Sequence, residues 1–369
     1  MKFASLLSFS LASACIAIIT PASFAAEGTS RMVDALEATG SLYQAGPSTQ
    51  PSSQGITMAD ALPVQLAQTD AIEQLMRQGF DQLNNRDYAA ALQTFEQVLS
   101  QNPNHVGAWM GKGYVFDDQE NYPEAIAAFE QALAINPEVV HAWVGLGNAL
   151  DDGGQPEAAL TAYGRAIAID SEASRAYYNR GITLMRLGRH SEANPDFQRT
   201  VELDPDYGRA WLKLGQTRLA LEQYPEALTA FDRALALDDG VSSAWHGRGI
   251  ALYELERYED ALVAFERTTA MTPEGRWGWM YRGHTLSILD RYEEALAAYE
   301  RVISISPDWS WAWYRKAAIL AALERFDEAR VAVAESLRID PNNTSAQELQ
   351  QDLRREIGRL PNPEVAQVF

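Results

Sequence analysis

Cysteine is almost absent from this sequence, because Cys15 is the only one in 369 residues. One cysteine cannot close a disulfide within the chain, and with only five histidines few ligands remain for a zinc site. Basic residues are also scarce, since 50 acidic residues outnumber 30 basic ones and give a formal charge of −20. Such a charge disfavours a nucleic-acid backbone as partner. We therefore predict no metal, no cofactor and no nucleic-acid partner.

The first 25 residues have the pattern of an export signal. Lys2 precedes an apolar stretch from Phe3 to Ile19, and small residues follow as far as Ala25. This pattern predicts a signal peptide over residues 1–25, cleaved near Ala25, and an exported protein that is periplasmic or extracellular. Two alternatives stay open. An uncleaved signal would anchor the chain in a membrane, although the apolar run is short for a spanning helix. A lipoprotein signal would end at Cys15.

Large apolar side chains are scarce in the next segment, residues 26–69. Its central part, "AGPSTQPSSQGIT", consists mainly of serine, glutamine, proline and glycine. A segment of this composition buries too little apolar surface to offset the entropy of ordering it. We predict a flexible linker over residues 26–69.

Beyond residue 70 the sequence repeats itself every 34 residues, and five columns of residues recur at that step. The tryptophan column is Trp109, Trp143, Tyr177, Trp211, Trp245, Trp279 and Trp313. The glycine column is Gly79, Gly113, Gly147, Gly181, Gly215, Gly249 and Gly283. The alanine column is Ala91, Ala125, Ala159, Ala193, Ala227, Ala261, Ala295 and Ala329. The aromatic column is Phe95, Phe129, Tyr163, Phe197, Phe231, Phe265 and Tyr299, and a proline column ends most units.

These columns resemble those of the tetratricopeptide repeat family. The resemblance implies eight tandem units over residues 70–343, which begin near residues 72, 106, 140, 174, 208, 242, 276 and 310. It also implies an all-α fold, a right-handed α-solenoid of helix–turn–helix units. "TSAQELQQDLRREIGRL", residues 344–360, is amphipathic and polar, which is typical of a helix that caps the end of a solenoid. We assign residues 344–369 to a capping helix and tail.

The residue types in the columns also favour packed helical hairpins. Glycine inside a helix costs about 1 kcal/mol relative to alanine, so the column is tolerable where it permits close packing. We expect the alanine column to lie on the other side of that contact. We expect the tryptophan column to fill the space against the next helix. Because a hairpin alone buries only part of its apolar face, the units must stack.

Three tryptophans lie outside the tryptophan column: Trp277, Trp309 and Trp311. Trp277 and Trp311 both hold the second position of their units, which the resemblance places in the concave groove where this family binds peptides. The same carry-over places Tyr281 and Tyr314 in the groove, together with Met280, His284 and Arg315. A patch of exposed aromatic residues is typical of a binding surface. The alternative is that these rings pack against neighbouring helices, and for Trp309 we expect such packing against the preceding repeat.

A second candidate site follows from the resemblance. Some family members hold a peptide carboxylate with basic and asparagine side chains from three successive repeats. The matching residues here are Asn148, Asn179, Arg209 and Lys213, with Val144 in place of one lysine and Arg175 as a substitute for the missing charge. The alternative is that the basic residues pair with acids of facing helices, which is common on solenoid surfaces.

The function that the resemblance implies is that of a non-catalytic adaptor. It would bind peptide segments of partner proteins in its groove, in the assembly of an envelope or membrane complex. A glycan-binding module that uses the groove tryptophans is the alternative, since indole faces stack on sugar rings. No set of nucleophile, acid and base is recognisable, so the sequence predicts no enzyme.

Overall fold

The computed structural model describes residues 58–357, and within them it contains seventeen α-helices and no strand. This confirms the predicted all-α class. The helices are α3 (Met58–Asn84), α4 (Tyr88–Gln101), α5 (Val106–Asp118), α6 (Tyr122–Ile135), α7 (Val140–Asp152), α8 (Pro156–Ile169), α9 (Ser174–Arg186), α10 (His190–Leu203), α11 (Gly208–Ala220), α12 (Tyr224–Leu237), α13 (Ser242–Glu254), α14 (Tyr258–Met271), α15 (Arg276–Ile288), α16 (Tyr292–Ile305), α17 (Ser310–Ala322), α18 (Phe326–Ile339) and α19 (Thr344–Ile357). The predicted signal peptide and the tail beyond 357 lie outside the described residues.

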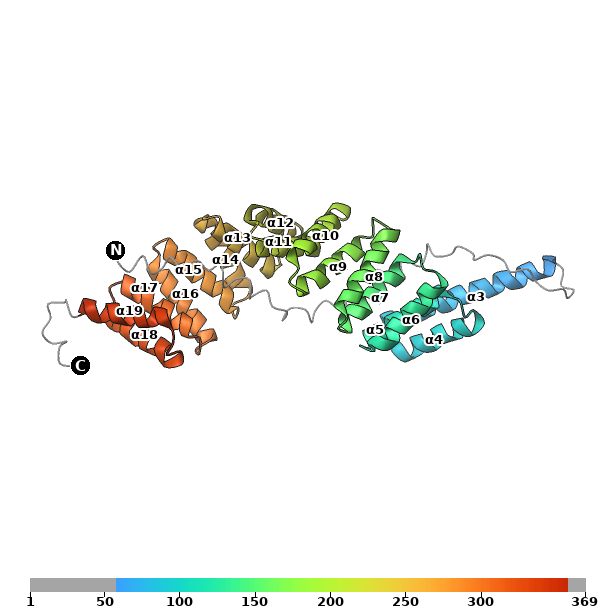
Figure 1. Ribbon diagram of the computed structural model, residues 1–369, viewed down its shortest axis with the longest axis horizontal. Helices are drawn as coiled ribbons and strands as arrows, with labels where there is room; N and C mark the ends of the chain where they lie inside the picture. The colour runs from blue at the N-terminus through green and yellow to red at the C-terminus, as the bar shows by residue number, and fades with distance from the viewer. Residues whose placement is uncertain (1–57, 358–369) are drawn as a thin grey trace. The chain divides into compact units, whose positions relative to one another are not determined.

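The helices pair into eight hairpins, α3 with α4 through α17 with α18, and each hairpin is one predicted repeat (Figure 1). The described residues form two compact units that divide between Pro205 and Asp206. The N-terminal unit contains the first four hairpins, and the C-terminal unit contains the last four and α19. We call the two helices of a hairpin its first and second helix.

The predicted linker is shorter than expected, because α3 begins at Met58. Residues 58–69 are therefore helical, which differs from the linker predicted over residues 26–69. The sequence "MADALPVQLAQT" contains alanine, leucine, methionine and glutamine, which are good helix formers. The prediction was drawn from the composition of the whole segment, in which the serine- and proline-rich centre dominates.

Each hairpin turns through one residue in the left-handed backbone conformation. This residue has a positive φ in all eight turns, at a constant step of 34 residues. It is glycine in two of them, and six turns use a larger residue: Arg86, Glu120, Glu222, Glu256, Asp290 and Glu324, with φ between 56° and 61°. A side chain costs energy in this conformation, so the turn geometry is imposed by the packing of the two helices.

The glycine column makes room for the aromatic column. A methyl group on Gly113 would lie 2.8 Å from the Phe129 ring of its own hairpin, and one on Gly181 would lie 2.9 Å from Phe197. The expectation that the alanine column closes this contact is thus wrong for these glycines. A flat ring approaches a helix backbone more closely than a second helix can, so each glycine receives a ring.

The same ring also contacts the next repeat, at a contact that we call a seam. A seam joins the aromatic-column ring of one hairpin to the sixth residue of the next first helix. Gly111 holds that position beside Phe95, and Gly145 holds it beside Phe129; a methyl group on either would lie 2.5 Å from the ring. Each of these two phenylalanines is therefore enclosed between two glycines, one from each repeat.

Four seams are filled by a larger residue than glycine at the sixth position: Asn179, Lys213, Tyr281 and Arg315. The contacts of three of them are as follows. The hydroxyl of Tyr163 donates a hydrogen bond of 2.8 Å to Asn148, which in turn binds Asn179 at the sixth position. Tyr281 stacks on Phe265 with ring centroids 5.2 Å apart. Arg315 Nε donates a 3.3 Å hydrogen bond to the hydroxyl of Tyr299.

The tryptophan column lies at the turns between hairpins, where its rings are half-buried. The indole N–H of Trp109 donates a 2.9 Å hydrogen bond to the carbonyl of Pro103, six residues earlier. The same bond recurs at Trp143, Trp245, Trp279 and Trp313. We expected these rings only to fill space against the next helix. Each of these five indoles also holds the turn before its helix through its N–H, which needs a hydrogen-bond partner.

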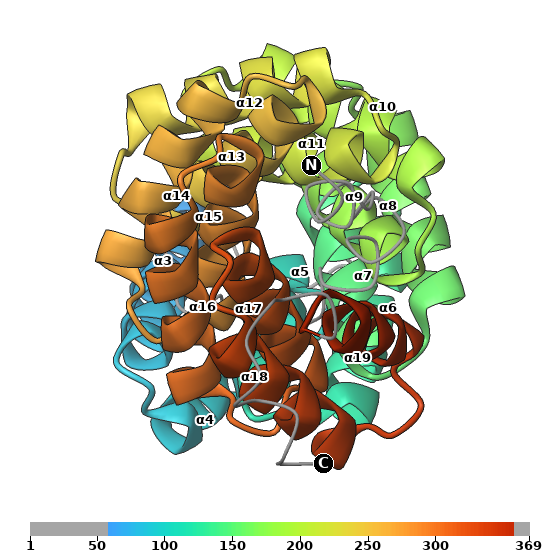
Figure 2. The same ribbon diagram turned by 90° about the vertical axis from the view of Figure 1, so that its left-hand side faces the viewer.

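First helices contact the first helices of neighbouring repeats within each unit, as α5 does with α7 and α13 with α15. Among the described helices, neighbouring second helices make no contact of this extent. We call the surface made by the first helices of a unit its first-helix face. At the C-terminal end α19 packs on α17 and α18 (Figure 2), and its residues Ala346, Leu349 and Leu353 are buried in the core there. This confirms a capping helix over Thr344–Ile357.

Candidate functional site

An amide pair joins two first helices of the N-terminal unit. Asn148 Oδ1, on α7, accepts hydrogen bonds of 2.8 Å from the Tyr163 hydroxyl and from Asn179 Nδ2 on α9. Both asparagines are half-buried. The sequence singled out these two residues, and the structure brings them together.

A charged contact lies one turn further along the same two helices. Asp151 on α7 accepts a 2.8 Å hydrogen bond from the Thr183 hydroxyl and forms an ion pair with Arg186 on α9. Asp151 is buried, whereas Arg186 is partly exposed. These three side chains were not singled out from the sequence, and they show that the face is polar beside the amide pair.

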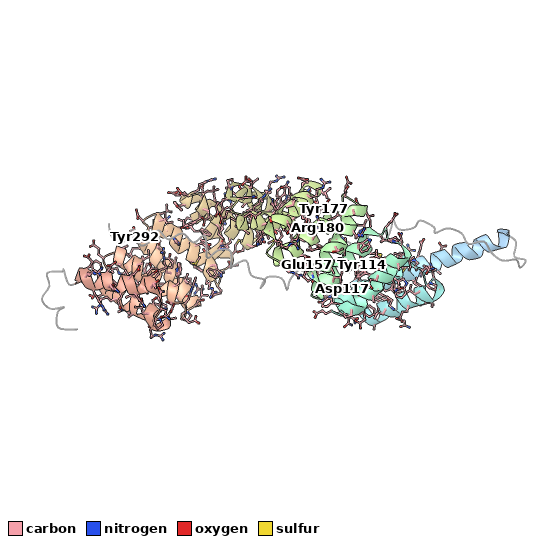
Figure 3. All side chains as sticks on the ribbon, viewed as in Figure 1. Tyr114, Asp117, Glu157, Tyr177, Arg180 and Tyr292 are labelled. Carbon is pink, nitrogen blue, oxygen red and sulfur yellow. The ribbon has the colours of Figure 1, made fainter. Side chains whose placement is uncertain are left out.

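Arg175 lies in the electrostatic environment of Tyr114, on the first-helix face of the N-terminal unit. Burial raises the pKa of Tyr114 to about 12, while the nearby Arg175 lowers it and Asp117 raises it further. Tyr114 and Asp117 lie one turn apart on α5 (Figure 3). Burial also lowers the pKa of His141, and Arg175 acts in the same direction. Arg175 itself is exposed, as it would have to be in order to replace the missing clamp lysine and bind a ligand.

The predicted carboxylate clamp is divided between the two units. Asn148 and Asn179 belong to the N-terminal unit, and Arg209 and Lys213 lie on α11 of the C-terminal unit. Arg209 is exposed, but Lys213 is buried at the sixth position of its repeat. A clamp made by all four residues stays a prediction.

The surplus tryptophans form one cluster in the C-terminal unit, which we call the tryptophan cluster: Trp277, Trp309 and Trp311. Trp309 stacks on Trp311 at 5.2 Å with an interplanar angle of 24°, and the Trp277 ring meets Trp309 edge-on at 5.2 Å. All three rings are half-buried. Trp309, expected to pack against the preceding repeat, does so through Trp277 on α15.

The other aromatic candidates are buried, contrary to the expectation of groove positions. Tyr281 is 1% exposed and stacks on Phe265, and Tyr314 is 7% exposed in the core beneath α19. Met280, His284 and Arg315 are buried as well. The sixth position fails as a groove position because it faces the aromatic ring of the preceding repeat, as the filled seams show. Direct ligand contact is therefore not supported for Tyr281 and Tyr314.

Two arginines complete the tryptophan cluster. The guanidinium of Arg276 lies 4.9 Å from the ring centroid of Trp277 and 5.3 Å from that of Trp309. Arg315 lies 5.5 Å from the centroid of Trp311. Arg276 was not singled out from the sequence, where only the aromatic residues were considered, although it directly precedes Trp277.

Metal and membrane sites find no support in the part of the chain that the structure describes. Within residues 58–357 no three histidine, cysteine or acidic side chains are grouped as metal ligands. No helix there has the length and apolar character to cross a membrane. His246 and His284 pack against aromatic rings, His246 against Phe265 and Tyr281 and His284 against Tyr253.

Sequence comparison identifies one family. A profile described as tetratricopeptide repeat matches residues 76–140, 112–176, 144–207, 178–242 and 246–310, and a second profile with that description matches residues 289–353. The matched ranges span more than half of the chain. A search of curated proteins found no match.

Solved structures with a similar fold include several repeat proteins. The C-terminal part of a repeat protein from Cytophaga hutchinsonii is 17% identical and covers 64% of this chain and 97% of that chain, with a TM-score of 0.54. YrrB, described as having an unusual peptide-binding site, is 28% identical and covers 52% of this chain and 99% of that chain, with a TM-score of 0.49. A repeat protein from Parabacteroides merdae is 19% identical and covers 68% of this chain and 98% of that chain, with a TM-score of 0.47.

Proposed function

We propose that this chain, which belongs to the tetratricopeptide repeat family, is a non-catalytic scaffold that binds segments of partner proteins on its first-helix faces. The family membership supports a repeat scaffold. The observation that carries the proposal further is the Asn148–Asn179 pair, which links two first helices on that face.

The amide pair retains one hydrogen-bond donor group and one acceptor. Asn148 Oδ1 is used by two donors, so the Nδ2 group of Asn148 and the Oδ1 of Asn179 have no partner among the side chains of residues 70–356. Neither atom is among the buried polar atoms that lack a partner, so both are open to solvent. Exchanging oxygen and nitrogen in both amides leaves the same complement. One donor beside one acceptor is what the main chain of an extended peptide requires.

The location that we propose is outside the cytoplasm. The sequence of residues 1–25 has the features of an export signal, and the serine- and proline-rich stretch that follows would tether the repeats. A scaffold held in this way would assemble partners in an envelope or membrane complex. Detection of the chain in a periplasmic or secreted fraction, with its N-terminus near Ala26, would support this location.

The experiment that tests the proposal compares captured proteins. Tagged wild type and the variant Asn148→Ala/Asn179→Ala are used to capture proteins from an envelope extract of the source cells, and each captured protein is quantified by mass spectrometry. We expect the variant to lose at least one partner about tenfold, because two charge-neutral hydrogen bonds are removed. Equal profiles for the two proteins would contradict a role for the pair.

A matched control separates binding from folding. Asn104 is an exposed asparagine in the turn before α5, so Asn104→Ala removes an amide without touching the pair. The control should keep the wild-type profile. Circular dichroism of each variant must show wild-type helix content, because Asn148→Ala also removes the hydrogen bond that the Tyr163 hydroxyl donates to Asn148.

The glycan alternative has weaker support. Sugar binding by stacking needs an open indole face. Trp309 and Trp311 cover one face of each other, and Arg276 and Arg315 lie over the rings of the cluster. A carbohydrate would have to displace these neighbours before it could stack.

A further inference from the structure

The tryptophan cluster and Arg276 form a surface of hydrogen-bond donors. Five indoles of the tryptophan column donate to a turn carbonyl. By contrast, the indole N–H groups of Trp277, Trp309 and Trp311 have no acceptor within the described side chains and backbone of residues 70–356, and none is a buried polar atom without a partner. Three donors are thus open to solvent beside a guanidinium. A ligand of this surface must supply acceptors.

Elsewhere in the described chain, most cations that stack on a tryptophan ring also pair with a carboxylate. Five tryptophans of the column carry a cation over the ring. Four of these cations, all on first helices, are paired with an acid of the preceding second helix: Lys112 with Glu96, Arg248 with Asp232, Arg282 with Glu266, and Lys316 with Glu300. The fifth, Arg233 over Trp211, comes from the second helix of the same hairpin and has no carboxylate partner among residues 70–356. Arg276 stacks in the same way but has no carboxylate partner among residues 70–356. Its neighbour Glu274 pairs with Arg301 instead.

A second cation reinforces the positive charge of the cluster. Arg315 lies over the other stacked indole, Trp311, and is 2% exposed. Its hydrogen bond goes to the neutral hydroxyl of Tyr299, and its Nη2 group is buried without an acceptor in the described residues. Two guanidinium groups therefore flank the indole pair with no carboxylate between them. In a protein of charge −20 this is a local site of the opposite sign.

We propose that the tryptophan cluster and Arg276 form a docking surface for an acidic segment of a partner polypeptide. A carboxylate of the partner accepts from the Arg276 guanidinium, and acceptors beside it receive the indole N–H groups. The ring contact holds the guanidinium plane in place while its edge remains free, which suits a two-pronged bond to a carboxylate. This proposal rests on the proposed function, since it names the chemistry of one partner segment.

A peptide array tests the charge preference. Fluorescently labelled wild-type protein is applied to immobilised 12-residue peptides in matched triplets that differ at one position, which is glutamate, glutamine or lysine. We expect triplets in which glutamate binds best, and solution anisotropy on the best of them should give about tenfold weaker binding for Arg276→Gln. Arg276→Lys keeps the charge without the planar fork and should fall between the two.

The matched control is Arg233→Gln. Arg233 is exposed, lies 5.8 Å from the ring centroid of Trp211 and has no carboxylate partner in the described part of the chain, but it stacks on one ring instead of two. It should bind the glutamate peptide as the wild type does. An equal loss in both variants would assign the effect to general electrostatics and overturn the site. Binding of an oligogalacturonate without any glutamate preference would assign the surface to an acidic glycan and also overturn it.

The two proposals can fail separately. Peptide binding without a glutamate preference would reject the acidic segment and leave the scaffold function in place. Absence of binding to any peptide would reject both. The variant Asn148→Ala/Asn179→Ala should keep the glutamate preference, because the amide pair belongs to the N-terminal unit and the tryptophan cluster to the C-terminal unit.

Discussion

The seam after the first repeat and the seam after the seventh repeat use the same position in opposite ways. Phe95 lies between Gly79 and Gly111, and a methyl group on either glycine would lie within 2.6 Å of the ring. Tyr299 meets Gly283 less closely, at 3.1 Å, and receives the long side chain of Arg315. One seam is closed by backbone against a ring, and the other is filled by a buried cation.

The difference shows what a ring hydroxyl permits. A phenylalanine offers no acceptor, so at Phe95 and Phe129 the next repeat contributes only backbone. A tyrosine offers an oxygen, and at Tyr163 and Tyr299 the next repeat contributes a polar side chain that is bound, directly or through Asn148, to that oxygen. At these two seams the polar side chain of the next repeat thus depends on the tyrosine oxygen. Lys213 and Tyr281 follow phenylalanines, so a polar residue at the sixth position does not require a tyrosine before it.

Adding a side chain to a glycine of a seam should destabilise the contact between the two repeats. Gly111→Ala places a methyl group 2.5 Å from the Phe95 ring, so we expect the free energy of unfolding to fall by about 3 kcal/mol. Gly164→Ala is the control, because no atom lies within 4 Å of the added methyl group. That change should stabilise the helix by up to about 1 kcal/mol. Urea unfolding followed by circular dichroism measures both, and equal effects would show that the ring contact is unimportant.

Removing a tyrosine hydroxyl from a seam should lower the free energy of unfolding. The loss should be larger where the hydroxyl binds a charged group than where it binds a neutral amide. Tyr299→Phe removes the one hydrogen-bond acceptor that the buried Arg315 guanidinium has among residues 70–356, and we expect a loss of about 2 kcal/mol. Tyr163→Phe leaves Asn148 bonded to Asn179, so the loss should be about 1 kcal/mol. The same urea measurement applies. A larger loss at Tyr163 would contradict the importance of the buried charge.

Acid should weaken the seam at Tyr281. His246 packs on the rings of Phe265 and Tyr281, and burial lowers its pKa from 6.5 to about 4. The folded state then binds fewer protons than the unfolded state between these values, so stability is complete above pH 6.5 and declines as the pH falls toward 4. His246→Phe should remove about 2 kcal/mol of the difference in unfolding free energy between pH 7.5 and pH 5. An unchanged pH dependence would contradict this.

The repeat register could be predicted from the sequence because each column is a steric requirement. A glycine at Gly113, a ring at Phe129 and a small residue at Ala125 each tolerate few alternatives, so their spacing fixed the helices and their pairing. The capping helix followed in the same way from its apolar stripe, with Leu349 and Leu353 buried.

The candidate site was harder to predict because it depends on contacts between repeats. The sixth position looked like a groove position, but its side chain meets the ring before it, as Tyr281 and Arg315 show. The resemblance named Asn148 and Asn179 as members of a carboxylate clamp but did not predict the hydrogen bond between them, because that bond depends on the direction of both side chains. Arg276 is a candidate because it has no carboxylate partner among residues 70–356, and the sequence alone does not show which charges are paired.

The hairpin turns have a practical consequence for anyone who engineers this chain. Six turns hold a non-glycine residue at positive φ, such as Glu120 and Asp290, and two already use glycine, Gly154 and Gly188. Relief of this backbone strain by glycine is worth about 1 kcal/mol for each turn, less the flexibility that glycine adds to the unfolded chain. The described residues thus contain six turn positions at which the thermal tolerance of the protein can be adjusted one step at a time.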